Sequence, residues 1–98
     1  MTAQQAKDIL LPIPEEDFIM GDYTDDEKCC ARGYLDKHFT GDPCGYSKEV
    51  SDLNIDIRMT LETSIENVND NKPNNPYEEA TPKQRVMHLL NDAIAAGL

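Results

Sequence analysis

The sequence lacks several features that would place it in a well-marked class. Its 98 residues include no Trp, two Phe and three Cys, and no apolar run approaches the ~18 residues that cross a bilayer. Few aromatics predict an aliphatic core, and the length allows one domain over residues 1–98. An odd number of cysteines favours reduced thiols. Because no long apolar run marks a secretory signal, we expect a cytoplasmic protein.

Positive charge is absent from one long stretch. Between Asp8 and Glu27 there are eight carboxylates and no Lys or Arg, and the chain carries a net charge of −10. Such a surface repels nucleic acid and membranes, so we expect neither as a direct ligand, and it attracts basic proteins. The alternative is a merely solvated face. We predict an acidic partner-binding surface comprising Glu15, Glu16, Asp17, Asp22, Asp25, Asp26 and Glu27.

Capping signals and apolar periodicity predict an all-α fold of three to four short helices with an irregular acidic N-terminal segment. The spacing Thr2-x-x-Gln5 is that of a capping box, and it predicts a first helix that the prolines at 12 and 14 stop. Residues 13–23 are expected to be irregular, with apolar residues 18–20 as their anchor. A second capping box, Thr24-x-x-Glu27, predicts a helix over about 25–38.

The second half of the chain contains one ambiguous stretch. Apolar residues from Val50 to Ile65 recur every three or four positions, which predicts a helix starting near Ser47. Alternation over residues 54–62 leaves a strand as the alternative. Asn- and Pro-rich residues 67–76 predict a loop. Thr81 as the cap, a proline at the first helical position and one apolar stripe then predict a closing helix that Gly97 ends.

Two groups of residues have side chains suited to metal binding or catalysis, but their spacing is unfavourable. The atom types of Cys29, Cys30, His38 and Cys44 suit zinc, yet the spacing does not match the usual pairs of ligands. Acidic surroundings raise the pKa of a thiol, so a catalytic Cys is not expected. Asn67, Asn69, Asn71, Asn75 and Glu78 approach the spacing of a calcium loop, but Lys72 occupies its glycine position, so a hydrogen-bonded loop is the better interpretation. We expect no metal, cofactor or catalytic site.

A solvated pairing with Asp92 is the ordinary interpretation of His88 in the closing helix. The sequence contains no zinc-protease, phosphate-loop or serine-hydrolase motif. We therefore expect that the protein is not an enzyme.

Two short blocks resemble those of a known family. Residues 29–35, Cys-Cys-Ala-Arg-Gly-Tyr-Leu, resemble a Cys-Ala-Leu-Gly-Ala-Leu block, and residues 68–70, Val-Asn-Asp, resemble a Trp-Asn-Asp block that precedes Thr and a C-terminal amphipathic helix. Both blocks occur in a family of small bacteriophage and bacterial proteins without an assigned activity. Arg32, Tyr34 and Val68 depart from its pattern. The resemblance implies a helical fold and a phage or mobile-element setting, and it implies no reaction.

These observations lead to three functional hypotheses. The first is a non-enzymatic acidic binding protein that docks on a basic surface of a host protein. The second is a small structural or accessory protein that forms homo-oligomers through apolar helix faces. The third is a metal-binding regulator that uses the Cys and His residues.

Overall fold

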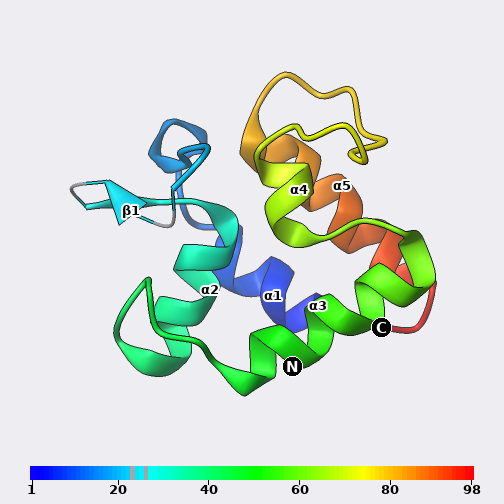
Figure 1. The fold of residues 1–98 in the computed structure, drawn as a ribbon, viewed down its shortest axis with the longest axis horizontal. Coiled ribbons are helices and arrows are strands. Elements are labelled where there is room, and N and C mark those ends of the chain that lie inside the picture. Colours follow the sequence, from blue (N-terminus) through cyan, green and yellow to red (C-terminus); the bar gives the residue numbers. More distant parts are fainter. Residues whose placement is uncertain (23, 26) are drawn as a thin grey trace.

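The computed structural model describes residues 1–22, 24, 25 and 27–98, and this part of the chain is mainly helical (Figure 1). Its five α-helices are α1 (Ala3–Leu10), α2 (Ala31–Thr40), α3 (Lys48–Leu61), α4 (Ile65–Asn69) and α5 (Pro82–Ala95). A short 3-10 helix, η1 (Glu15–Asp17), and an antiparallel hairpin of β1 (Thr24–Asp25) and β2 (Lys28–Cys29) lie between α1 and α2. The prediction of a mostly helical fold is confirmed, but the hairpin means that it is not all-α.

Helix α2 begins later than the sequence predicts. The predicted start of the helix at residue 25 is wrong, because Thr24 and Asp25 form β1 and pair with β2, whereas residues 31–38 of the predicted helix do lie in α2. The N-cap is Cys30, whose thiol accepts the N–H of Gly33 at 3.3 Å. Residues 18 and 29 also form a β-bridge, and the N–H of Ile19 donates to the carbonyl of Cys29 at 3.1 Å. These pairings require an extended backbone in both strands, so the helix predicted from residue 25 cannot form there.

The ambiguous stretch is helical, so the strand alternative for residues 54–62 is wrong. Ser47 caps α3 as predicted by accepting the N–H of Val50. The apolar series up to Ile65, however, spans two helices, because Glu62 adopts a left-handed conformation with φ 59° and ends α3. Ser64 then caps α4. The predicted loop over 67–76 is wrong in its first three residues, which belong to α4.

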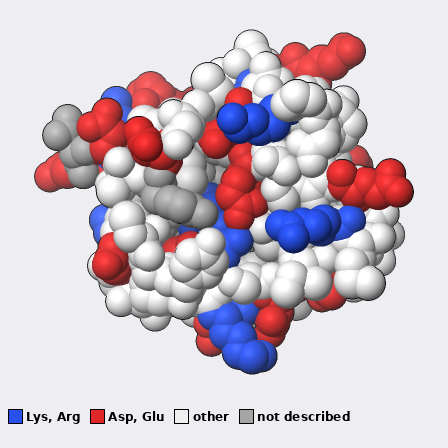
Figure 2. All heavy atoms as spheres, viewed as in Figure 1, with Lys and Arg blue, Asp and Glu red and all other residues white. Residues whose placement is uncertain are grey.

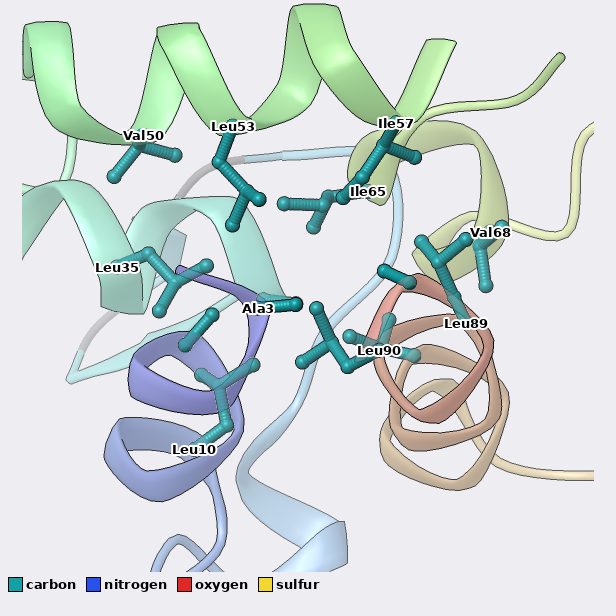
Figure 3. Packing of buried hydrophobic residues seen from close by; sticks show 14 of the residues in the cluster. Ala3, Leu10, Leu35, Val50, Leu53, Ile57, Ile65, Val68, Leu89 and Leu90 are labelled. Atoms are coloured by element: carbon teal, nitrogen blue, oxygen red, sulfur yellow. The ribbon is translucent and has the colours of Figure 1, made fainter. Parts of the chain in front are cut away.

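The buried apolar side chains form one cluster between the helices (Figure 3). Helix α1 packs against α5 and α2, and α4 packs against α5 and α2. The cluster is mainly aliphatic, as the composition predicts, and its buried aromatic members are Phe18 and Tyr77. Its fully buried large members are Leu10, Leu35, Val50, Leu53, Ile57, Ile65, Val68, Val86, Leu89 and Leu90.

The two ends of the chain lie beside one another. The N–H of Ala3 donates to the carbonyl of Leu98 at 3.2 Å, and Thr2 and Gln5 form the predicted capping box. Thr81 caps α5 and Pro82 stands at its start, also as predicted. No helix that the structure describes has the length and apolar character needed to cross a membrane.

The buried position of Leu90 makes a measurable prediction. Its side chain is fully buried in the cluster, so Leu90→Ala should lower the free energy of unfolding by about 2–5 kcal/mol. Leu11→Ala is the matched control, because that leucine is 56% exposed. Urea unfolding followed by circular dichroism measures both. Equal losses for the two variants would contradict the packing of α5.

Candidate protein-binding site

The predicted acidic surface lies on residues 15–27, which we call the acidic segment. Six of its seven predicted carboxylates belong to described residues, and Asp26 lies outside them. Five of the six residues are exposed, while Asp17 is half-buried. Figure 2 shows carboxylates gathered over the hairpin at the left of the molecule. Residues 13–22 of the stretch predicted to be irregular are described, and they contain the short helix η1, while residue 23 lies outside the described residues.

One described carboxylate of the segment, that of Asp17, has a cationic neighbour. The ammonium of Lys28 lies 3.8 Å from Asp17 Oδ1 and donates to the carbonyl of Glu16 at 3.2 Å. Both partners of the ion pair are about half-exposed, so solvent screens the pair strongly. The other five described carboxylates have no Lys or Arg within ion-pair distance among the described residues. Among the described carboxylates of the segment, the expectation of unpaired side chains is therefore wrong only for Asp17.

The side chains of Asn69 and Asp70 anchor the acidic segment to α4. Asn69 is fully buried; its Nδ2 donates to the carbonyl of Ile19 at 2.8 Å, and its Oδ1 accepts the N–H of Ala31 at 3.0 Å. Asp70 Oδ1 accepts the N–H of Gly21 at 3.0 Å and that of Asn69 Nδ2 at 2.9 Å. Helix α4 thus holds the chain on both sides of the hairpin.

The N-terminal end of the acidic segment is held by other contacts. The hydroxyl of Tyr34 donates to the carbonyl of Asp17 at 2.6 Å, and its ring packs edge-on against buried Phe18. The predicted apolar anchor is thus confirmed at Phe18, whereas Met20 is 55% exposed. Just before the segment, the ammonium of Lys83 donates to two carbonyls of residues 11 and 13. These contacts fix the segment as part of the folded body.

The buried guanidinium of Arg85 stabilises the end of α4, where the anchoring residue Asn69 lies. Arg85 is 4% exposed, and its donors reach the carbonyls of Val68 at 2.9 Å and Asn69 at 2.8 Å. Those carbonyls end α4, where the helix dipole is negative, so the cation stabilises the helix there. Arg85 also donates to the carbonyls of residues 79 and 80 and to the sulfur of Met20. This role could not be predicted from the sequence, because an arginine in an amphipathic helix is ordinarily solvated.

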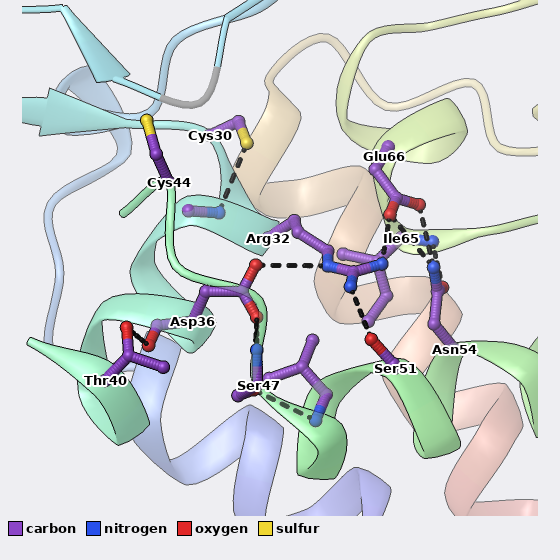
Figure 4. Close-up of polar contacts among 12 residues, drawn as sticks. Cys30, Arg32, Asp36, Thr40, Cys44, Ser47, Ser51, Asn54, Ile65 and Glu66 are labelled. Atoms are coloured by element: carbon purple, nitrogen blue, oxygen red, sulfur yellow. Dashed lines mark hydrogen bonds and ion pairs between the residues drawn. The ribbon is translucent and has the colours of Figure 1, made fainter. Parts of the chain in front are cut away.

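A second buried arginine joins three helices (Figure 4). The guanidinium of Arg32 lies 3.3 Å from Asp36 and 2.6 Å from Glu66, and it donates to Ser51 at 2.9 Å. Asn54 donates to both oxygens of Glu66 at 3.0 and 2.9 Å. Helices α2, α3 and α4 are therefore connected through one network. Arg32, which departs from the family pattern, is a structural residue here.

Burial and pairing act against each other in this network. Burial disfavours the charged guanidinium of Arg32, but the hydrogen bond and charge of Glu66 and the charge of Asp36 outweigh it and raise the pKa of Arg32. Burial likewise disfavours the Glu66 carboxylate, but hydrogen bonds from Asn54, its own backbone and Arg32 lower the pKa of Glu66. Both groups are consequently charged at neutral pH.

A small cavity of about 220 Å³ lies between the acidic segment and α4. It is lined by Gly21, Asp22, Cys30, Glu66 and Asp70. Burial, together with the charges of Asp70 and Glu66, raises the pKa of the Cys30 thiol to about 11. The thiol is therefore protonated at neutral pH and is a poor nucleophile. The cavity is a negatively charged hollow next to the acidic surface.

The structure does not bring the predicted Cys and His residues together as a metal site. Cys29 and Cys30 are buried and Cys44 is exposed, all three as free thiols. The ring of His38 packs against Phe39. Within residues 1–22, 24, 25 and 27–98, no group of three or more His, Cys, Asp or Glu side chains is placed to hold a metal ion.

The predicted polar loop is held by its own hydrogen bonds. Asn75 Nδ2 donates to Asn71 Oδ1 at 3.0 Å and to the carbonyl of Tyr77 at 2.8 Å. His88 has a different first partner from the one predicted, because its Nδ1 lies 2.9 Å from Glu79 while Asp92 is 3.9 Å from Nε2. Asp92 instead accepts the hydroxyl of Tyr77 at 2.8 Å.

Comparisons with known proteins give no relative: the chain matches no protein-family model, no curated protein and no solved structure. The two blocks that resemble the bacteriophage and bacterial family do meet in space. Asn69 of the second block accepts the N–H of Ala31 in the first.

Replacing the buried amide tests the anchor. Asn69→Ala leaves the N–H of Ala31 and the carbonyl of Ile19 without their partner, so we expect a loss of about 1–3 kcal/mol in stability. Hydrogen exchange should quicken in the acidic segment before the rest of the protein unfolds. Asn74→Ala, at an exposed loop position, should change neither quantity. Unaltered exchange over residues 15–31 in Asn69→Ala would contradict the anchoring role.

Acid should weaken the buried network through Glu66. Its pKa in the folded state lies below the ordinary value of 4.5, so the folded protein binds this proton less readily than the unfolded chain. The resulting stability is fully present above about pH 4.5 and is lost as pH falls through the lowered pKa. Glu66→Gln removes this titration. Urea unfolding between pH 7 and pH 3 should show a smaller acid loss for the variant, and parallel curves would contradict it.

Proposed function

We propose that this chain is a non-enzymatic acidic binding protein that docks, through the acidic segment, on a basic surface of a partner protein. The observation that carries the proposal is the combination of charge and anchoring. Exposed carboxylates lie on a segment whose backbone is fixed at residues 17, 19 and 21 by side chains of α2 and α4. A solvated face needs no such attachment.

Anchoring matters for affinity because ordering a loop on binding is unfavourable. A segment already held in one conformation avoids much of that entropy loss, so more of the attraction between charges appears as binding free energy. The long-range field of the carboxylates also speeds encounter with a basic partner and depends on salt. Rapid, salt-sensitive association is thus the expected behaviour.

The distribution of positive charge supports the same proposal. Of the nine Lys and Arg residues, Arg32 and Arg85 are buried, and Lys83 and Lys28 donate to backbone carbonyls. These four cations make contacts within the fold, although Lys28 stays about half-exposed and Arg32 is buried together with Asp36. The cavity beside Asp22 extends the negative surface inward, and its size and charge suit one basic side chain of the partner.

The proposed location is the cytoplasm of a bacterium. The proposed origin is a phage or another mobile element, as the family resemblance implies. Direct binding of nucleic acid or membrane is not part of the proposal, since both carry the same sign of charge as the acidic segment. Catalysis is not part of the proposal either. The thiol of Cys30 is held protonated, and the donors of Arg32 and Arg85 are engaged in the fold.

Charge reversal tests the proposed docking. Changing Glu15, Glu16 and Glu27 to Lys removes exposed carboxylates of the segment without touching its anchors. Passed over lysate of the native host at low salt, the wild type should retain a basic protein that this variant does not. With that protein purified, the association rate should fall at least tenfold in the variant, and the wild-type rate should fall as salt shortens the Debye length.

A control variant separates the site from net charge. Glu49, Asp56 and Glu78 are exposed outside the acidic segment, and their change to Lys alters net charge by the same amount. Retention of the partner should survive in this control. If both triple variants lose the partner alike, or neither does, the acidic segment is not the docking site.

A further inference from the structure

One large apolar side chain is exposed within the acidic segment. Among the described residues of the segment, Met20 is 55% exposed, whereas Phe18 is buried and Ile19 is half-buried. Carboxylates precede and follow it along the chain, at Asp17 and Asp22. Protein interfaces commonly surround an apolar contact with a polar rim, and methionine is one of the residue types enriched in them. Met20 thus has the position expected of a contact residue.

The backbone on both sides of Met20 is fixed. The carbonyl of Ile19 accepts the amide of Asn69 at 2.8 Å, and the N–H of Gly21 donates to Asp70 Oδ1 at 3.0 Å. Gly21 has φ 90°, a conformation that favours glycine, so the chain turns directly after Met20. The end of α4 therefore sets the position of Met20 through its two neighbours in the chain.

The side chain of Met20 is held as well. Nη2 of Arg85 donates to its sulfur at 3.3 Å, and Arg85 itself is 4% exposed. A methionine side chain has three rotatable bonds, so immobilising it on binding is entropically unfavourable. Because the contact with a buried guanidinium already restricts this side chain, less of that entropy remains to be lost when a partner covers it.

The negatively charged cavity begins beside Met20. Its lining includes Gly21 and Asp22, the next two residues along the chain, together with Asp70. Asp22 has no Lys or Arg within ion-pair distance among the described residues. A partner that contacts Met20 therefore brings its neighbouring side chains to a negative hollow, where a basic side chain is favoured.

We propose that Met20 is the apolar contact of the docking surface, and that it recognises an apolar side chain of the partner that stands next to a basic one. This inference rests on the proposed docking function and specifies the chemistry of the partner. The carboxylates attract any basic surface, because their field acts at long range. The contact with Met20 forms only at close range, so it selects among basic partners.

Two synthetic peptides of equal charge test this selection. One alternates Arg with Leu, and the other has Ser in place of each Leu. Isothermal titration calorimetry should show that the protein binds the Leu peptide about fivefold more tightly, because burying the exposed part of a methionine side chain is favourable. Met20→Ala should abolish this preference and leave the affinity for the Ser peptide unchanged. Met20→Leu, which keeps an apolar side chain, should retain the preference.

Met59→Ala is the matched control, because this methionine is 80% exposed and lies on α3, outside the acidic segment. It should change the affinity for neither peptide. Reversing the charges of Glu15, Glu16 and Glu27 should weaken the binding of both peptides alike, and added salt should do the same. Circular dichroism melting checks that each variant is folded.

The outcomes separate this inference from the docking function. Equal, salt-sensitive affinities of the wild type for the two peptides overturn the role of Met20 and leave the docking function standing. A Leu preference that Met20→Ala keeps, or that Met59→Ala also abolishes, overturns the role of Met20 as well. If neither peptide binds in a salt-sensitive way, the docking function fails, and the role of Met20 fails with it.

Discussion

The side-chain amide of Asn69 is the contact on which the N-terminal half of the structure depends. It is fully buried, donates to the carbonyl of Ile19 and accepts the N–H of Ala31. One group therefore sets both where the acidic segment crosses α4 and where α2 begins. Because both backbone groups would otherwise lose a partner away from water, the amide cannot be replaced cheaply. The hairpin between those two points is held as a consequence.

Two buried arginines extend this constraint in different ways. Arg85 has carbonyl acceptors, at the end of α4 and in the loop before α5, so it stabilises partial charges of the backbone. Arg32 has full carboxylates, Asp36 and Glu66, so it neutralises charge that burial would otherwise disfavour. Together they connect α2, α3, α4 and α5 through polar contacts, in a protein whose apolar core is small. Both cations are thereby withdrawn from the surface.

The sequence predicts the parts of this fold that local signals decide. The capping box at Thr2, the caps at Ser47 and Thr81, and the apolar stripe of α5 all lie within a few residues of what they control. The start of α2 could not be predicted in this way. Its local signal at Thr24 is a good capping box, but the deciding contact comes from Asn69, 38 residues away from Ala31. Tertiary hydrogen bonds overrode local propensity there.

The candidate site, like the fold, could be predicted from the sequence only in part. Composition predicts which residues carry the negative charge, because an excess of carboxylates over nine cations is visible in the sequence. It does not predict that the segment is anchored, since Asn69 and Asp70 read as ordinary turn residues until their partners are known. The roles of Arg32 and Arg85 were missed for the same reason. A buried arginine leaves no local signal, and only its distant acceptors distinguish it from a solvated one.

Anchoring and charge together determine how the proposed docking surface responds to salt. The acidic segment concentrates negative charge on a backbone that is held at residues 17, 19 and 21, so its attraction for a basic partner weakens as ions screen it.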